Sequence, residues 1–95
     1  MPQLIFGWDS GKNLSNQKKH GISFEEAQTV FVDEYALFMH DPDHSGEEDR
    51  FILLGLSVKL RVVVVCHCYR KTDEVIRIIS ARRATRSEQK QYWKR

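Results

Sequence analysis

The stretch FILLGLSVKLRVVVVCHCYRKTDEVIRIISAR, residues 51–82, determines the fold class of this chain. It contains three apolar segments, residues 51–58, 60–69 and 74–82, which are rich in Val, Ile, Leu and aromatic residues and joined by short connections. This is the pattern of an antiparallel β-meander. The run of four valines at 62–65 is apolar on both faces of a strand, so we expect this strand to be central and covered on both sides.

The residues before the meander predict a strand, two helices and a further short strand. Gln3–Trp8 is apolar-rich, and Asp9-Ser10 can cap a helix that runs to about Lys19 and ends at Gly21. A capping box at Ser23 and Glu26 opens a second helix. The last strand before the turn-rich residues 41–46 is expected at Ala36–His40.

After the meander, Thr85 and Glu88 form another capping box, which opens a helix reaching Trp93. The predicted order is strand, two helices, four strands and a helix, which makes an α+β domain with an antiparallel sheet packed by two N-terminal helices and one C-terminal helix. Spacing assigns five residues to the core: Phe24, Val30, Phe31, Phe51 and Trp93.

Length, composition and charge limit the function classes. The 95 residues, 41% apolar and 29% charged, suit one globular domain over 1–95, and no apolar run approaches the ~20 residues that span a bilayer. With no signal-peptide pattern and no disulfide framework, the chain is expected to be cytoplasmic. Residues 1–75 carry a net charge of −4 and residues 76–95 one of +6, which suggests an anionic partner for the C-terminal end or docking of that end on the acidic half.

The last hairpin decides which side chains share a face. An odd loop of five residues, 70–74, places His67 opposite Arg77 and Val65 opposite Ile79. The other face then pairs Cys66 with Ile78 and Cys68 with Ile76. His67 is either a functional group beside Arg77 or a satisfied, partly buried histidine.

Cations gather at two further places. Arg82, Arg83 and Arg86 surround the helix start capped by Thr85, where guanidiniums and backbone N–H groups favour an anion. Their alternative role is to pair with the acidic half of the chain. Lys18, Lys19 and His20 end the first helix, where they either form a second cationic wall or only complement the helix dipole.

Two further assignments complete the candidate residues. Tyr92 lies one turn after Glu88 and either stacks a base or packs against the core. The spacing of His40, Asp41, Asp43 and His44 is too loose for a defined metal site, and no cofactor is expected. The two cysteines are expected to be small buried hydrophobes.

Several motifs in register resemble the BrnT family of toxins from type II toxin–antitoxin modules. They are WDSGKNLSNQKKHGISFEEAQTVF (residues 8–31), DPDHSGEEDRFILLGLS (residues 41–57) and VIRIISARRATRSEQKQYW (residues 75–93). The resemblance covers nearly the whole chain. It implies a RelE-like fold, a ribonuclease that blocks translation, and neutralisation by a BrnA-type antitoxin with a ribbon-helix-helix DNA-binding part.

The chemistry expected from this resemblance is metal-independent cleavage in which the ribose 2′-OH attacks the adjacent phosphorus. Such a reaction needs cations at the phosphate and groups that transfer protons. We expect the catalytic residues among Arg77, Arg82, His67, His20 and Glu88. The expected RNA contacts are Lys18, Lys19, Arg83, Arg86 and Tyr92.

Two alternatives remain from the sequence. The chain is either a module that only binds an acidic or DNA-binding protein, or an RNA-binding domain without catalysis. In the toxin interpretation, operator DNA is contacted only through the antitoxin within a hetero-oligomer.

Overall fold

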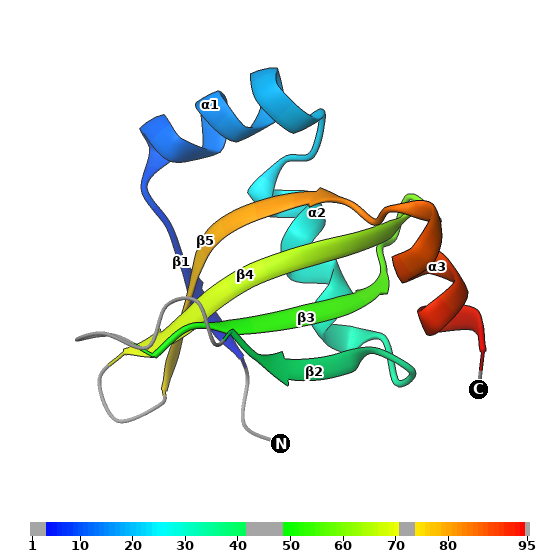
Figure 1. Cartoon of the computed structure of the whole chain (residues 1–95). Helices are drawn as coiled ribbons and strands as arrows, with labels where there is room; N and C mark the ends of the chain where they lie inside the picture. Colours follow the sequence, from blue (N-terminus) through cyan, green and yellow to red (C-terminus); the bar gives the residue numbers. More distant parts are fainter. Residues whose placement is uncertain (1–3, 42–48, 71–73, 95) are drawn as a thin grey trace.

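The computed structural model describes residues 4–41, 49–70 and 74–94 (Figure 1). The elements follow in the order β1 (Ile5–Gly7), α1 (Ser10–His20), α2 (Phe24–Thr29), the 3₁₀ turn η1 (Val30–Val32), β2 (Leu37–His40), β3 (Phe51–Leu56), β4 (Val62–Arg70), β5 (Val75–Arg83) and α3 (Arg86–Trp93). The α+β class and the order of helices and strands are as predicted.

One five-stranded sheet with the order β1-β5-β4-β3-β2 organises these elements. Strands β2 to β5 form the predicted antiparallel meander. The N-terminal strand β1 instead runs parallel to β5 at the sheet edge and pairs only with residues 75–77. The sheet is therefore mixed, and the sequence pattern alone did not indicate this edge pairing.

The predicted register of the β4–β5 hairpin is wrong. His67 lies opposite Ile78, Cys68 opposite Arg77 and Cys66 opposite Ser80, with a register shift between Cys66 and His67. On the loop side of that shift Arg70 lies opposite Val75, so the connection between the strands is even rather than odd as expected. His67 and Arg77 therefore do not face each other, and a β-bulge beyond His67 shifts the pairing by one further residue, so that Val65 lies opposite Ala81.

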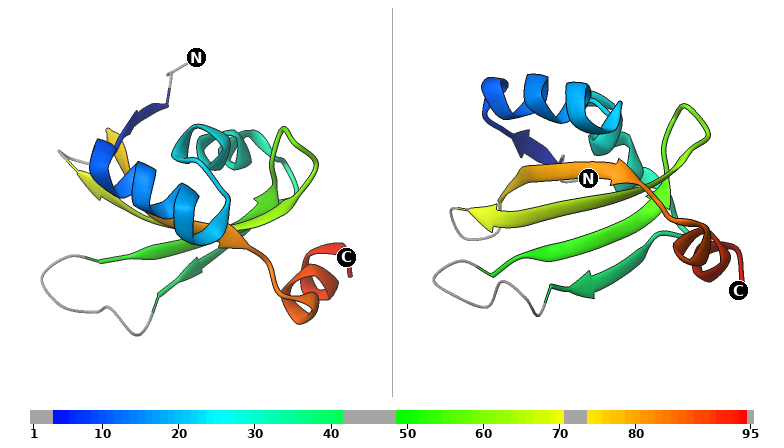
Figure 2. Two further views of the ribbon diagram at one scale, coloured as in Figure 1. Left: turned by 90° about the horizontal axis from the view of Figure 1, so that it is seen from above. Right: turned by 45° about the horizontal axis from the view of Figure 1, so that its top comes forward.

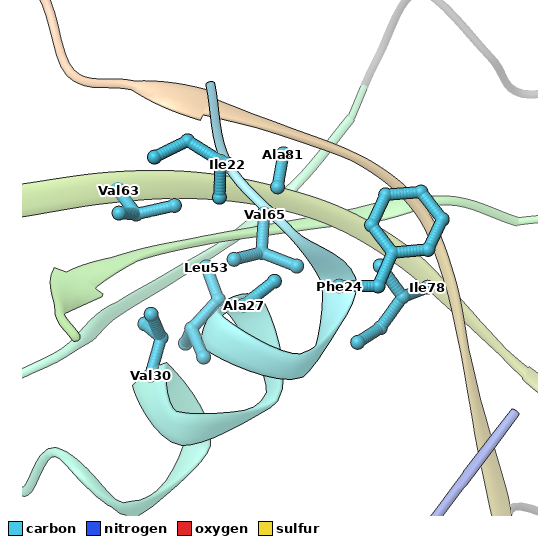
Figure 3. Packing of buried hydrophobic residues seen from close by; sticks show 9 residues of the cluster. All are labelled: Ile22, Phe24, Ala27, Val30, Leu53, Val63, Val65, Ile78 and Ala81. Carbon is cyan, nitrogen blue, oxygen red and sulfur yellow. The ribbon is translucent and has the colours of Figure 1, made fainter. Parts of the chain in front are cut away.

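The helices cover the two faces of the sheet unequally. Figure 2 shows α1 and α2 on one side of the sheet and α3 on the other, at the end of β5. The larger core lies under α2 (Figure 3) and consists of Ile22, Phe24, Ala27, Val30, Leu53, Val63, Val65, Ile78 and Ala81. The smaller core lies under α3 and consists of Leu54, Val62, Val64, Ala84 and Tyr92. Because β4 contributes to both, its expected central position is confirmed.

The predicted helix caps are present, with one difference. The side chains of Asp9, Ser23 and Thr85 accept hydrogen bonds from backbone N–H groups in the first turns of α1, α2 and α3, and Gly21 closes α1 in the left-handed conformation with φ of 72°. Thr85 and Glu88 form a complete capping box. The carboxylate of Glu26 is instead used in a buried ion pair with Arg61, so the box at Ser23 is only half formed.

The core assignments hold for four of the five residues. Phe24 and Val30 are fully buried, Phe31 packs against the larger core, and Phe51 is partly buried. Trp93 was wrongly assigned to the core, because it is 61% exposed while the neighbouring Tyr92 is buried. The reason is the direction of α3, which turns position 92 toward the sheet and position 93 toward solvent.

Candidate functional site: the cationic end of β5

Contacts between distant segments bring the end of α1 to the end of β5. The Asn16 side chain donates to the carbonyl of Ala81 at 2.8 Å and accepts from its N–H at 3.1 Å. It thereby pairs with β5 much as another strand would, beyond the point where β1 stops. The Arg61 Nη2 donates to the carbonyl of Gly21 at 3.3 Å, which ties the helix end to the turn between β3 and β4. Figure 1 shows the end of α1 above the end of β5 and the chain running from β5 into α3.

The β5–α3 corner holds a two-point ion pair. Arg82 donates from Nη1 to Oε1 of Glu88 at 2.8 Å and from Nη2 to Oε2 at 2.9 Å. The Arg82 side chain is 42% exposed and that of Glu88 30%, so solvent and ligands reach the pair. Glu88 also accepts from the backbone N–H of Thr85 at 2.8 Å, so the capping box fixes the carboxylate that holds the guanidinium.

This geometry leaves part of the Arg82 guanidinium for a ligand. Of the five N–H donors of an arginine, two are used on Glu88 and one on the carbonyl of Arg83 at 3.3 Å. Nε–H and one N–H of Nη2 have no partner in the part of the chain that the structure describes. These two donors form the side-on fork that fits two oxygens of one phosphate.

The ion pair also sets the charge of both groups. Hydrogen bonding from Arg82 lowers the pKa of Glu88 to about 2, against the opposing effect of burial. The same contact raises the pKa of Arg82. Near neutral pH the corner therefore holds a carboxylate and a guanidinium, and the carboxylate is a weak base because its pKa is so low.

The remaining cations of this end lie on different sides of the sheet. Arg82 is opposite Val64, which belongs to the α3 side, whereas Arg83 is opposite Val63, which belongs to the α2 side. Further exposed or partly exposed cations and polar groups are Lys18, Lys19, His20 and Arg86. Among the described residues, the one ion pair made by residues 76–94 is internal to that segment, Arg82 with Glu88. Within the described residues, therefore, no ion pair supports docking of the basic end on the acidic half of the chain.

Arg77 lies away from this corner. It shares the α3 side of β5 with Arg82, but the two lie five strand positions apart, roughly 16 Å at about 3.3 Å per residue. At this separation the two guanidiniums contact different points along a bound strand rather than a single phosphate.

His67 lies in a buried cluster of aromatic rings on the α2 side. Its side chain is 0% exposed, and its ring centroid lies 4.8 Å from that of Phe31 and 5.4 Å from that of Tyr69. Nδ1 lies 3.5 Å from the carbonyl of Val65, and Nε2 has no partner among the described residues. Burial lowers the pKa of His67 to about 4, so the imidazole is neutral near pH 7. An RNA backbone does not reach this ring in the folded chain.

We expect the stability of the chain to fall on acidification because of His67. The pKa is about 4 in the folded state and 6.5 as the ordinary value, so the unfolded state binds the proton first as pH falls below 6.5. The free energy of unfolding should thus decrease between pH 6.5 and 4, by about 3 kcal/mol from this residue. Urea unfolding at intervals of half a pH unit measures this slope. His67→Phe should remove that part of the slope and His20→Asn should retain it; an unchanged slope in His67→Phe would contradict the assignment.

At the end of α3, Tyr92 takes the packing alternative of its two expected roles, whereas Trp93, expected in the core, is exposed. Tyr92 is 3% exposed and donates from its hydroxyl to Oδ2 of Asp33 at 2.6 Å. Its ring is therefore in the packing role rather than available to a base. Trp93, which sequence reasoning did not select for the site, is the exposed aromatic residue of this helix. The helical spacing gives no signal to distinguish adjacent aromatics until the docking direction of α3 is known.

Other features of the molecule lie outside this corner. An open groove of about 520 Å³ is lined by Phe6, Gln28, Thr29, Val32, Asp33, Leu56, Ser57 and Val58, none of which was expected in the site. Nowhere in residues 4–41, 49–70 and 74–94 do three or more His, Cys, Asp or Glu side chains form a group that could hold a metal ion. His40 Nε2 lies 3.8 Å from Oδ1 of Asp49, whereas Asp43 and His44 lie outside the described residues. Within the described part of the chain, neither Cys66 nor Cys68 forms a disulfide.

The helices of the described residues include none that is long and apolar enough to cross a membrane.

Comparison with known proteins identifies the family. No curated protein matches the chain significantly. Among solved structures, the 1.1 Å crystal structure of the Brucella abortus ribonuclease toxin BrnT shares the fold, with a TM-score of 0.67 and 23% sequence identity over 88% of this chain and 100% of that one. Residues 8–88 match the family described as ribonuclease toxin, BrnT, of type II toxin–antitoxin systems. Since that match extends from Trp8 through the Arg82–Glu88 corner, the chain belongs to the BrnT family of ribonuclease toxins.

Proposed function

We propose that this chain cleaves RNA without a metal ion, with the β5–α3 corner as the centre of the site. The ribose 2′-OH attacks the adjacent phosphorus, the P–O5′ bond breaks, and the products are a 2′,3′-cyclic phosphate and a 5′-OH end. The observation that carries the proposal is the Arg82 guanidinium, which Glu88 holds at two points while two of its donors stay available. Pre-oriented donors at the place where charge develops are often the largest single contribution to catalysis.

In this reaction Arg82 stabilises the negative charge on the non-bridging phosphate oxygens. Glu88 acts as a positioning residue, because a carboxyl group with a pKa of about 2 accepts a proton poorly near neutrality. Arg83, Arg86, Lys18 and Lys19 contact neighbouring phosphates, and Arg77 contacts the strand at a point farther along β5. Contacts of this kind determine the position of the backbone and make binding depend on salt.

We place proton transfer on His20 rather than on His67. His20 ends α1, and Asn16, one helical turn earlier, is hydrogen-bonded to Ala81 beside Arg82. It is partly exposed, and imidazole is a common general acid and base in catalysis. His67 is buried with a depressed pKa, so we leave it out of the reacting groups.

Incubation of the purified chain with a structured RNA in excess EDTA tests the reaction. We expect cleavage to continue, with products that end in a cyclic phosphate and carry a 5′-OH on the other side of the cut. Arg82→Ala serves as the inactive control, and a parallel reaction with translating ribosomes tests for ribosome dependence. RNA that stays intact in both reactions, with the fold confirmed by circular dichroism, would instead favour a module that only binds a partner.

The biological setting follows from the family. A type II toxin has an antitoxin, and we propose a BrnA-type partner with a ribbon-helix-helix part that contacts operator DNA on behalf of the complex. Cleavage of RNA by the free toxin would inhibit translation in the cytoplasm. The isolated chain is then expected to lack specific affinity for operator DNA, and specific binding by the chain alone would contradict this division of roles.

A further inference from the structure

The outward face of α3 carries three cations and an exposed indole. With about 100° of rotation per residue, Arg86, Lys90, Trp93 and Lys94 fall within an arc of about 100° on the helix surface. Tyr92 and Glu88 lie on the opposite side, where they contact Asp33 and Arg82. The same helix thus docks on the sheet through one face and presents a basic, aromatic stripe on the other.

All four residues of this stripe are exposed, and Trp93 is 61% exposed. Within the described part of the chain, none of the three cations has an ion-pair partner. Their charge is therefore available to an anionic ligand. The exposed Trp93 lies between these cations. Leaving a large aromatic side chain in water is unfavourable, so the tryptophan does not serve solubility.

Contacts beneath α3 hold the Trp93 ring in place. It packs edge-on against the ring of Tyr92, with centroids 4.8 Å apart, and the Tyr92 hydroxyl is held by Asp33 at 2.6 Å. Asp33 in turn accepts from the N–H of Leu56 in β3 at 2.8 Å. This series of contacts anchors the end of α3 to the sheet and limits the freedom of the indole before any ligand binds.

We propose that the stripe of Arg86, Lys90, Trp93 and Lys94 binds single-stranded RNA, with one base stacked on Trp93 and the flanking phosphates on the cations. A basic surface that follows the backbone, together with an aromatic platform for bases, is the arrangement by which proteins bind single strands without base specificity. Arg86, the first residue of α3, places one end of the stripe next to the β5–α3 corner along the chain, whereas Glu88 and Arg82 lie on the other side of the helix. The proposal rests on RNA as the substrate.

The stripe lies on the side of α3 that faces away from the Arg82–Glu88 contact. The family match ends at residue 88, and Lys90, Trp93 and Lys94 lie beyond it. We therefore expect the stripe to add affinity for flanking nucleotides rather than to take part in the chemistry.

Binding is best measured with a fluorescein-labelled 2′-O-methyl uridine decamer. This RNA lacks the free 2′-OH that the proposed cleavage needs, so affinity is measured without reaction. Trp93→Ala should weaken binding about tenfold or more, the value of one stacked base, and Trp93→Phe should restore most of it. Lys90→Ala and Lys94→Ala should each lower the slope of log Kd against log salt by about 0.7. Lys59→Ala, in the turn between β3 and β4, is the matched control and should change neither quantity.

Intrinsic fluorescence gives a second measurement. The chain has two tryptophans, Trp8 and Trp93, so quenching by the decamer should disappear in Trp93→Phe. A Trp93→Ala chain that binds within twofold of the parent would overturn the proposal. Tight binding of poly-glutamate in place of the decamer would also overturn it and assign the stripe to an acidic polypeptide. If the chain binds ordinary RNA but does not cleave it, the proposed nuclease reaction is rejected and the proposed binding by the stripe is retained.

Discussion

Arg82→Ala is expected to lower the rate of RNA cleavage by about 100-fold or more, because it removes donors aimed at the charge that develops on the phosphate. Arg82→Lys should recover only a small part, since an ammonium group keeps the charge but loses the planar fork held by Glu88. Single-turnover rates on a labelled RNA, with the protein in saturating excess over the RNA, separate this loss from weaker binding.

Two further variants make this result specific. Glu88→Gln keeps an acceptor for the cap of α3 but weakens the hold on Arg82, so we expect a smaller loss of rate, mainly in kcat. Lys12→Ala, in the first turn of α1, removes a cation at a distance from the corner and should leave the rate unchanged. Cleavage by Arg82→Ala within a few-fold of the parent, with an unchanged melting temperature, would show that the charge is stabilised elsewhere.

Arg61→Ala is expected to produce the largest loss of stability, about 3–5 kcal/mol, because it leaves a buried carboxylate without its cation. The Glu26 side chain is 1% exposed and is paired with Arg61, whose Nε also donates to Oε2 at 3.0 Å. Burial raises the pKa of Glu26, but hydrogen bonds from Arg61 and Ser57 outweigh it and keep the pKa below its ordinary value. Chemical denaturation at pH 7 measures the loss of unfolding free energy.

The double variant Glu26→Gln with Arg61→Ala is the informative comparison. A neutral amide removes the uncompensated charge, so the double variant should be more stable than Arg61→Ala alone. Lys59→Ala, two residues away on the exposed turn, should change the stability by less than about 0.5 kcal/mol. A loss below 1 kcal/mol in Arg61→Ala would show that the carboxylate finds another partner or takes up a proton at little cost.

The prediction of the fold from sequence succeeded where local signals agree. The apolar runs at 51–82 alternate and end as strands do, and the central strand β4 is apolar on both faces because both faces are covered. The caps at Asp9, Ser23 and Thr85 depend on hydrogen bonds between residues two or three apart. Interactions of this range are encoded by neighbouring residues, so a pattern in the chain is enough to find them.

The sequence predicted which residues the candidate site contains but not how they are arranged. Arg82, Arg83 and Arg86 follow from composition and from the cap, but the pairing of Arg82 with Glu88 depends on the turn between β5 and α3. The pairing of Arg70 with Val75 sets a register in which His67 lies opposite Ile78 rather than Arg77, and burial places the imidazole among aromatic rings. Neither event leaves a mark on the sequence pattern, because each is decided by how two strands and two layers fit together.

The sequence by itself determined the α+β class, the order of the elements and the concentration of positive charge in residues 76–95. Only the tertiary structure decided which of those charges are available: Arg82 keeps two free donors because Glu88 and the carbonyl of Arg83 hold the other three, and Trp93 is exposed because Tyr92 reaches Asp33. Local sequence specifies hydrogen bonds and periodicity along one element. The direction in which each side chain finally points is set by the packing of that element against the rest of the chain.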